Sequence, residues 1–113
     1  MRARELALCL MMASAACGPQ LDVGETRGAR AIQSRGCGGC HEIGGVPGAS
    51  GRVGPPLKGV TSRMYVGGML LNTPQNLALW IRDPRSVNPK TAMPTLGVTE
   101  EEAEDISAYL RTQ

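Results

Sequence analysis

The motif Cys37-Gly38-Gly39-Cys40-His41 limits what this chain can be more than any other feature. Two thiols at this spacing can each add to one vinyl group of a haem, and the adjacent imidazole can then face the iron. A redox disulfide usually sits in a strand–helix context that is missing here, and a zinc site would need further Cys or His ligands. A purely structural disulfide would leave His41 without a role. The motif therefore predicts one covalently bound haem c.

The chain has a single histidine, His41, so a second ligand to the iron must be another residue type. Met93 lies between Ala92 and Pro94 in a loop after a predicted helix, where the backbone can present a thioether to the metal. Met64 and Met69 lie in a Gly-rich stretch before that helix and are interpreted as packing residues, the usual role of Met. His41 and Met93 are thus the predicted metal ligands. Such ligation gives a relatively high reduction potential and a closed iron, which suits electron transfer.

The small size of the folded part agrees with a bound cofactor. About 85 residues remain once the N-terminal segment is set aside, and a domain of that size has a marginal core that usually needs a disulfide, a metal or a cofactor. The chain contains no Phe and 15 glycines. A haem is a large apolar disc around which such a chain can collapse.

Three helices are predicted from periodicity and capping signals. The first covers residues 25–35 and ends at Gly36. The second starts at Thr73-Pro74, with Thr73 as cap and Pro74 where a missing N–H is harmless, and stops at Pro84. The third starts with a capping box at residues 99–102 and continues to about residue 111. The residues expected to face the core are Ala29, Ala31, Ile32, Leu77, Trp80, Ile81, Ala103, Ile106, Tyr109 and Leu110.

Long loops are expected between these helices. Residues 44–59 are dense in Gly and Pro, and Pro89 and Pro94 bracket an extended segment around Met93. No strand signal and no internal repeat is evident. The predicted fold class is all-α, with three or four helices and long loops wrapped around one haem.

Several segments resemble class I cytochrome c: Cys37–His41, Gly54-Pro55-Pro56-Leu57, Met93-Pro94 and Ala108-Tyr109-Leu110. The resemblance covers roughly residues 24–112. Residues 72–77, 80–84 and 93–102 are more narrowly similar to the cytochrome c domain fused to subunit II of some haem–copper oxidases. The membrane helices and copper-binding residues of such a subunit are absent from the sequence, so we expect a free-standing relative.

The resemblance implies further site residues. Pro55 matches the proline whose carbonyl accepts the proton of the haem-ligating histidine. Leu57 would pack on the haem face, and Trp80 would line the Met side. Arg63 matches a basic residue near the haem propionates, and Thr91 would hydrogen-bond in the same region. A loop proline, a solvated arginine and a core tryptophan are the plainer alternatives, and for Arg63 and Thr91 they remain open.

The N-terminal residues are expected to direct export. Residues 1–16 combine Arg2 and Arg4 with an apolar run that ends in small residues, and this run is shorter than the roughly 20 residues of a membrane span. Cys17 follows a segment that resembles a bacterial lipoprotein cleavage site, except that Ser14 replaces the usual aliphatic residue. Ordinary cleavage is the alternative. The predicted organisation is an export signal at 1–16, a tether at 17–24 with a lipid anchor at Cys17, and a cytochrome c domain at 25–113.

Charge is unevenly distributed along the chain. Between Arg27 and Lys90 the sequence has nine basic and two acidic residues. From Glu100 onward it has five acidic residues and one arginine. Neither a basic run nor an aromatic stacking platform indicates a nucleic-acid partner.

The function expected from the motif and the resemblance is one-electron transfer, with a membrane terminal oxidase or another respiratory redox protein as partner. The alternative is an electron-transfer subunit of a larger respiratory or dehydrogenase complex. No second histidine or catalytic pair supports an enzyme. We expect a monomer on the periplasmic side of the bacterial cytoplasmic membrane, held there by a lipid.

Overall fold

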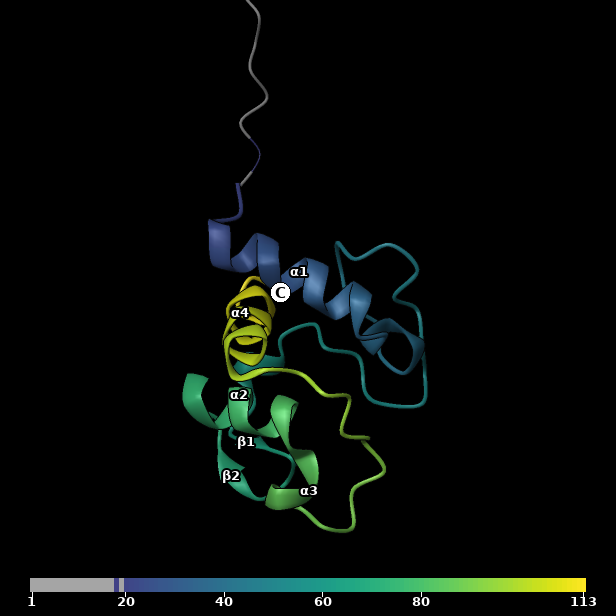
Figure 1. Cartoon of the computed structure of the whole chain (residues 1–113), viewed down its shortest axis with the longest axis vertical. Helices are drawn as coiled ribbons and strands as arrows, with labels where there is room; N and C mark the ends of the chain where they lie inside the picture. Colours follow the sequence, from purple (N-terminus) through teal and green to yellow (C-terminus); the bar gives the residue numbers. More distant parts are fainter. Residues whose placement is uncertain (1–17, 19) are drawn as a thin grey trace, which may run out of the picture.

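The computed structural model describes residue 18 and residues 20–113, so the predicted export signal and Cys17 lie outside the described residues. Its elements are α1 (Val23–Ser34), the 3₁₀ helix η1 (Cys37–Gly39), the 3₁₀ helix η2 (Val60–Ser62), β1 (Tyr65–Val66), β2 (Leu70–Leu71), α2 (Pro74–Arg82), α3 (Pro84–Val87) and α4 (Glu100–Leu110). The helix α4 packs against both α1 and α2, and long loops extend to one side of these three helices (Figure 1). The predicted all-α fold is confirmed.

The first helix begins two residues before the predicted start. The Asp22 carboxylate accepts a hydrogen bond from the Glu25 N–H at 2.8 Å, and the Glu25 carboxylate accepts one from the Asp22 N–H at 2.9 Å. This reciprocal capping box fixes Val23 as the first helical residue. Ordered helix therefore replaces the last residues of the predicted tether at 17–24. At the other end Gly36, with φ of 72°, follows the C-cap, as predicted.

The second helix has the predicted start and stop. The Thr73 hydroxyl accepts a hydrogen bond from the Asn76 N–H at 3.1 Å, and Pro74 is the first helical residue. The helix ends at Arg82, before Pro84. The short helix α3 was not predicted: Pro84 ends α2 but also opens α3, for which Asp83 is the cap.

The last helix matches its prediction closely. Thr99 and Glu102 form both bonds of the capping box. The four residues expected on the inner face are all at most 3% exposed: Ala103, Ile106, Tyr109 and Leu110. The inner face of α1 is less accurately predicted, because Ala31 and Ile32 are buried but Ala29 is only half-buried.

A small antiparallel hairpin corrects the expectation of no strands. Tyr65 pairs with Leu71 and Val66 pairs with Leu70. Strands of two residues are too short to show an alternating pattern in a sequence. Met64 and Met69 flank the first and second strands, and they are 70% and 61% exposed. Their interpretation as packing residues is therefore wrong.

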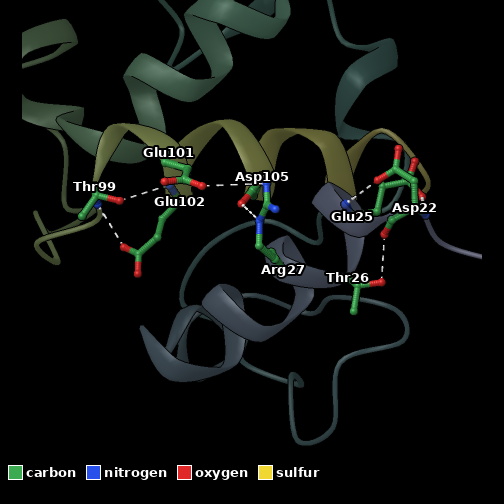
Figure 2. A network of polar contacts seen from close by, with 8 residues as sticks. All are labelled: Asp22, Glu25, Thr26, Arg27, Thr99, Glu101, Glu102 and Asp105. Carbon is green, nitrogen blue, oxygen red and sulfur yellow. Dashed lines mark hydrogen bonds and ion pairs between the residues drawn. The ribbon is translucent and has the colours of Figure 1, made fainter.

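The crossing of α1 over α4 requires a residue without a side chain. A Cβ added at Gly28 would lie 2.6 Å from the carbonyl carbon of Asp105 and 3.0 Å from the Cβ of Tyr109. Beside this contact the Arg27 guanidinium pairs with the Asp105 carboxylate at 2.7 Å (Figure 2). Close backbone approach and ion pairing thus hold the two terminal helices together. In the described part of the chain, no helix has the length and apolar character needed to cross a membrane.

Candidate functional site

A largely apolar cavity of about 530 Å³ lies between the helices and the long loops. Its walls come from the end of α1, η1, the loop at 53–57, the hairpin, α2, the loop around Met93 and α4. All nine site residues predicted from the sequence line this cavity: Cys37, Cys40, His41, Pro55, Leu57, Arg63, Trp80, Thr91 and Met93.

The turn η1 brings the two thiols and the imidazole to the same wall. The carbonyl of Cys37 accepts hydrogen bonds from the N–H of Cys40 at 3.2 Å and of His41 at 3.0 Å. Both cysteines are free thiols, so no disulfide occupies the motif. Burial raises the pKa of the Cys37 thiol. The motif thus presents two free thiols and one imidazole ring at the cavity surface.

His41 is held in one orientation by a neighbouring loop. Its Nδ1 lies 2.7 Å from the carbonyl oxygen of Pro55, which can only accept a hydrogen bond. The N–H of Gly54 donates to the Cys40 carbonyl at 2.7 Å, which ties this loop to the motif. A Cβ on Gly54 would overlap the imidazole, with Nδ1 only 2.7 Å away. The Nδ1 proton is therefore committed to Pro55, and Nε2 is left as the basic nitrogen.

Met93 lines the cavity from a different part of the chain. It is half-buried in the extended segment between α3 and α4. Its N–H donates to the Thr91 hydroxyl oxygen at 3.1 Å. Thr91 therefore shapes the turn that carries Met93, a role that the resemblance to known cytochromes did not suggest.

The remaining predicted residues have distinct surroundings. The Trp80 ring packs so closely on Gly67 that a Cβ there would lie 2.6 Å from it. Leu57 packs against the core from a partly buried position. The Arg63 guanidinium donates to the Pro56 carbonyl at 2.6 Å. Sequence reasoning missed Gly54, although its place directly before Pro55 and Pro56 was a usable signal.

The cavity has the properties that a haem needs. Its volume lies within the roughly 300–1,000 Å³ of typical cofactor sites, and its walls are mainly apolar. An imidazole nitrogen and a thioether sulfur are the donor pair of His/Met haem sites. Because Gly54 has no side chain, the His41 imidazole has room in the orientation that the structure shows. No cluster of three or more His, Cys, Asp or Glu residues suited to a bare metal ion occurs at residue 18 or in 20–113. The residues present therefore fit a haem.

Comparison with known proteins agrees with this chemistry. The model of the family described as "Cytochrome c" matches residues 25–113. The chain belongs to the cytochrome c family. Membership means that this cytochrome c is a haem-binding protein of electron transport.

Two curated relatives carry a similar segment within much longer chains. Cytochrome c oxidase subunit 2 of Alkalihalophilus pseudofirmus (strain ATCC BAA-2126 / JCM 17055 / OF4) is 36% identical over 87 residues, which cover 76% of this cytochrome c and 25% of the relative. Cytochrome c oxidase subunit 2 of Bacillus sp. (strain PS3) is 36% identical over 84 residues, which cover 71% and 24%. The chain thus spans about a quarter of each relative. No solved structure matches it significantly.

Proposed function

We propose that this chain is a monohaem c-type cytochrome that carries single electrons to a membrane terminal oxidase. The observation that carries the proposal is the single cavity lined by both motif thiols, by His41 and by Met93. A bound haem supplies an iron that is reversibly reduced by one electron. The protein residues attach it, orient it and keep water from it.

Cys37 and Cys40 are the proposed attachment points. These two thiols would hold a haem through thioether bonds to its two vinyl groups, in an addition that keeps every atom of the thiol and the vinyl group. No oxidant is consumed. Because both cysteines lie in or directly after η1, two such bonds would tie the cofactor to this turn, directly before His41 in the sequence.

His41 and Met93 are the residues proposed to bind the haem iron. The Pro55 carbonyl accepts a hydrogen bond from Nδ1 of His41, which sets the ring orientation and leaves Nε2 as the nitrogen available to the iron. Thr91 fixes the backbone turn that carries Met93. Leu57 and Trp80 provide apolar walls, and Arg63 lies where one cation can meet carboxylate groups of the cofactor.

The proposed acceptor rests on the relatives. Both matched proteins are named as subunits of cytochrome c oxidase, which supports a respiratory oxidase as the partner. A subunit role inside a larger respiratory or dehydrogenase complex is the second form of the same proposal. Under either form the chain is exported to the periplasmic side of the bacterial membrane.

Covalent attachment is tested by denaturing the purified protein in acidified organic solvent. The haem should stay with the polypeptide through two thioether bonds. Changing both Cys37 and Cys40 to Ala should make it extractable. Haem that leaves the wild-type protein in the solvent would contradict the proposal.

Cys17 is proposed as a lipid anchor. Little chain separates it from the folded domain, because α1 is already capped at Asp22. Four residues, 18–21, lie between them, and four residues can span at most about 14 Å. The domain would therefore stay beside the membrane, where its effective concentration for a membrane partner is high. Cys17→Ser should release the protein from membranes with an unchanged spectrum. Wild-type protein that washes off equally well would exclude an anchor.

A further inference from the structure

A series of side-chain hydrogen bonds leads from the start of α2 to the loop that holds His41. Asn72 lies directly before Thr73, the cap of α2. Its amide nitrogen donates to two carbonyl oxygens, those of Val60 and Arg63, each at 2.9 Å. Both side-chain donors of the half-buried Asn72 are therefore committed to the turn that contains η2.

Arg63 continues the series toward the motif. With its backbone held by Asn72, its guanidinium reaches across the loop and donates to the Pro56 carbonyl at 2.6 Å. Neither Pro55 nor Pro56 has an N–H, so this dipeptide cannot be anchored through a backbone donor. The two carbonyl oxygens are the only polar groups through which the dipeptide can be held. Pro56 uses its carbonyl for Arg63, and Pro55 uses its carbonyl for His41.

We propose that Asn72 and Arg63 are positioning residues for His41. They hold the Pro55–Pro56 dipeptide in place, so that the Pro55 oxygen stays on Nδ1 of the imidazole. The proposal rests on the proposed role of His41 as a ligand, because only then does the strength of this bond reach the iron. Sequence reasoning gave Arg63 a place near the propionates and gave Asn72 no role.

The proposal predicts a local effect that general stability does not. Without the Asn72 amide, the Arg63 carbonyl loses its hydrogen bond, so we expect the Pro56 contact to weaken and the Pro55 oxygen to move more freely. The Nδ1 proton of His41 then exchanges faster with water. A weaker bond to Pro55 also makes the imidazole a poorer donor, so the reduction potential rises.

Asn76 offers a matched control. Its amide nitrogen also donates to a carbonyl, that of Leu71 at 2.9 Å, but this bond joins α2 to β2 and does not reach Arg63. Leu at either position has a shape close to that of Asn and carries no charge. Asn72→Leu and Asn76→Leu thus each remove amide hydrogen bonds near the hairpin, and only the first removes the hold on Arg63.

The experiment measures hydrogen exchange of the His41 Nδ1 proton by NMR in the reduced haem protein labelled with ¹⁵N-histidine. Because a net hydrogen bond contributes about 0.5–1.5 kcal/mol, Asn72→Leu should accelerate exchange by about two- to thirteenfold. Its potential should rise, whereas Asn76→Leu should leave exchange and potential at wild-type values. Equal exchange in wild type and Asn72→Leu, or equal acceleration in both variants, would overturn the proposal.

A second variant keeps the test decisive if Asn72→Leu does not fold. Arg63 is exposed, so Arg63→Met is expected to fold, and it removes the contact with Pro56 directly. It should accelerate the same exchange, and unchanged exchange would overturn the proposal. Failure of the proposed function has another signature: the haem would be extractable, or the His41 resonances of the wild-type protein would lack the shifts of an iron-bound ring.

Discussion

Gly54 stands at the closest contact of the candidate site. Its Cα lies so near the imidazole that any Cβ would overlap His41. Gly54→Ala should therefore turn the ring or push Pro55 away from Nδ1, and the purified protein should carry less haem per polypeptide. Pyridine haemochrome absorbance against protein concentration measures this ratio.

Gly39→Ala is the control for this substitution, because a Cβ on Gly39 meets nothing within 4 Å. It lies inside the motif and should leave the haem content unchanged. Equal haem loss in both variants would mean that the motif rejects any added methyl group, and the specific contact with His41 would then be irrelevant.

Met93 can be separated from the other methionines by substitution. Met93→Ala should remove the far-red sulfur-to-iron absorption band, lower the reduction potential and let added imidazole or cyanide bind, because the sixth position opens. Met64→Ala and Met69→Ala should do none of this, since both side chains are largely exposed. Loss of the band in Met64→Ala would show that the ligand is wrongly assigned.

At the level of single residues, the sequence was informative where chemistry needs a particular side chain. A thiol, an imidazole or a thioether at fixed spacing predicts a role by itself, and the residues so predicted all line one cavity. Residues that act by position were harder to find. Asn72 acts through two carbonyls that are nine and twelve residues away. No local pattern marks a bond of that kind.

Pairing between α1 and α4 should make the stability depend on pH. The pKa of Glu102 lies below its ordinary value of 4.5. The main cause is the hydrogen bond that its carboxylate accepts from the Thr99 N–H, and pairing with the Arg35 guanidinium adds to it. The folded protein therefore binds the proton less readily than the unfolded chain. Glu102 contributes stability above about pH 4.5, and this contribution is lost as the pH falls through the lower folded pKa.

Urea unfolding at pH 7 and at pH 3 tests this expectation. Glu102→Gln keeps a capping side chain but cannot ionise, so its free energy of unfolding should fall less on acidification than that of the wild type. Glu104 is exposed and serves as the control, because Glu104→Gln should retain the wild-type pH dependence. An identical pH dependence in Glu102→Gln and wild type would show that this carboxylate contributes nothing.

Elements with strong end signals were predictable, and short elements were not. The helices α2 and α4 start at capping residues that are legible in the sequence. The start of α1 was misplaced even though Asp22 and Glu25 have the spacing of a capping box. Each strand of the hairpin has two residues and α3 has four. In elements this short, tertiary contacts decide the conformation. Trp80 packed on Gly67 is such a contact.

Helix packing decides which charges of the molecule are paired and which are not. The acids of α4 are largely used internally: Asp105 and Glu101 pair with Arg27, Glu102 pairs with Arg35, and Glu100 pairs with Arg82. Among residues 20–113 the cations without an acidic partner include Arg63, which lines the cavity. They also include Arg52, Lys58 and Lys90, each directly next in sequence to a residue of the cavity wall. An acidic partner surface would be attracted to that side.

Electron transfer to oxidase-containing membranes should therefore slow as salt is added. The Debye length is only about 8 Å at physiological ionic strength, so attraction between exposed charges weakens quickly. Arg52→Gln together with Lys58→Gln should lower the rate at low salt and flatten its salt dependence. Arg30→Gln, on the exposed side of α1, should not. A flat profile for the wild type would indicate apolar docking.

The crossing of α1 over α4 also decides when the molecule can close. Arg27 and Asp105 are 78 positions apart in the sequence. The contact that joins the two helices therefore closes a very long loop, which costs conformational entropy and slows its formation. Until α4 docks, α1 lacks the helix against which it mainly packs. The thiols of the motif therefore stay accessible late, and a chain cut after Val98 should react faster with a thiol reagent at Cys37 than the intact apoprotein. Closure of the cavity therefore depends on α4, whose residues Ile106 and Leu110 form part of its wall, and we expect a cofactor to enter before α4 docks.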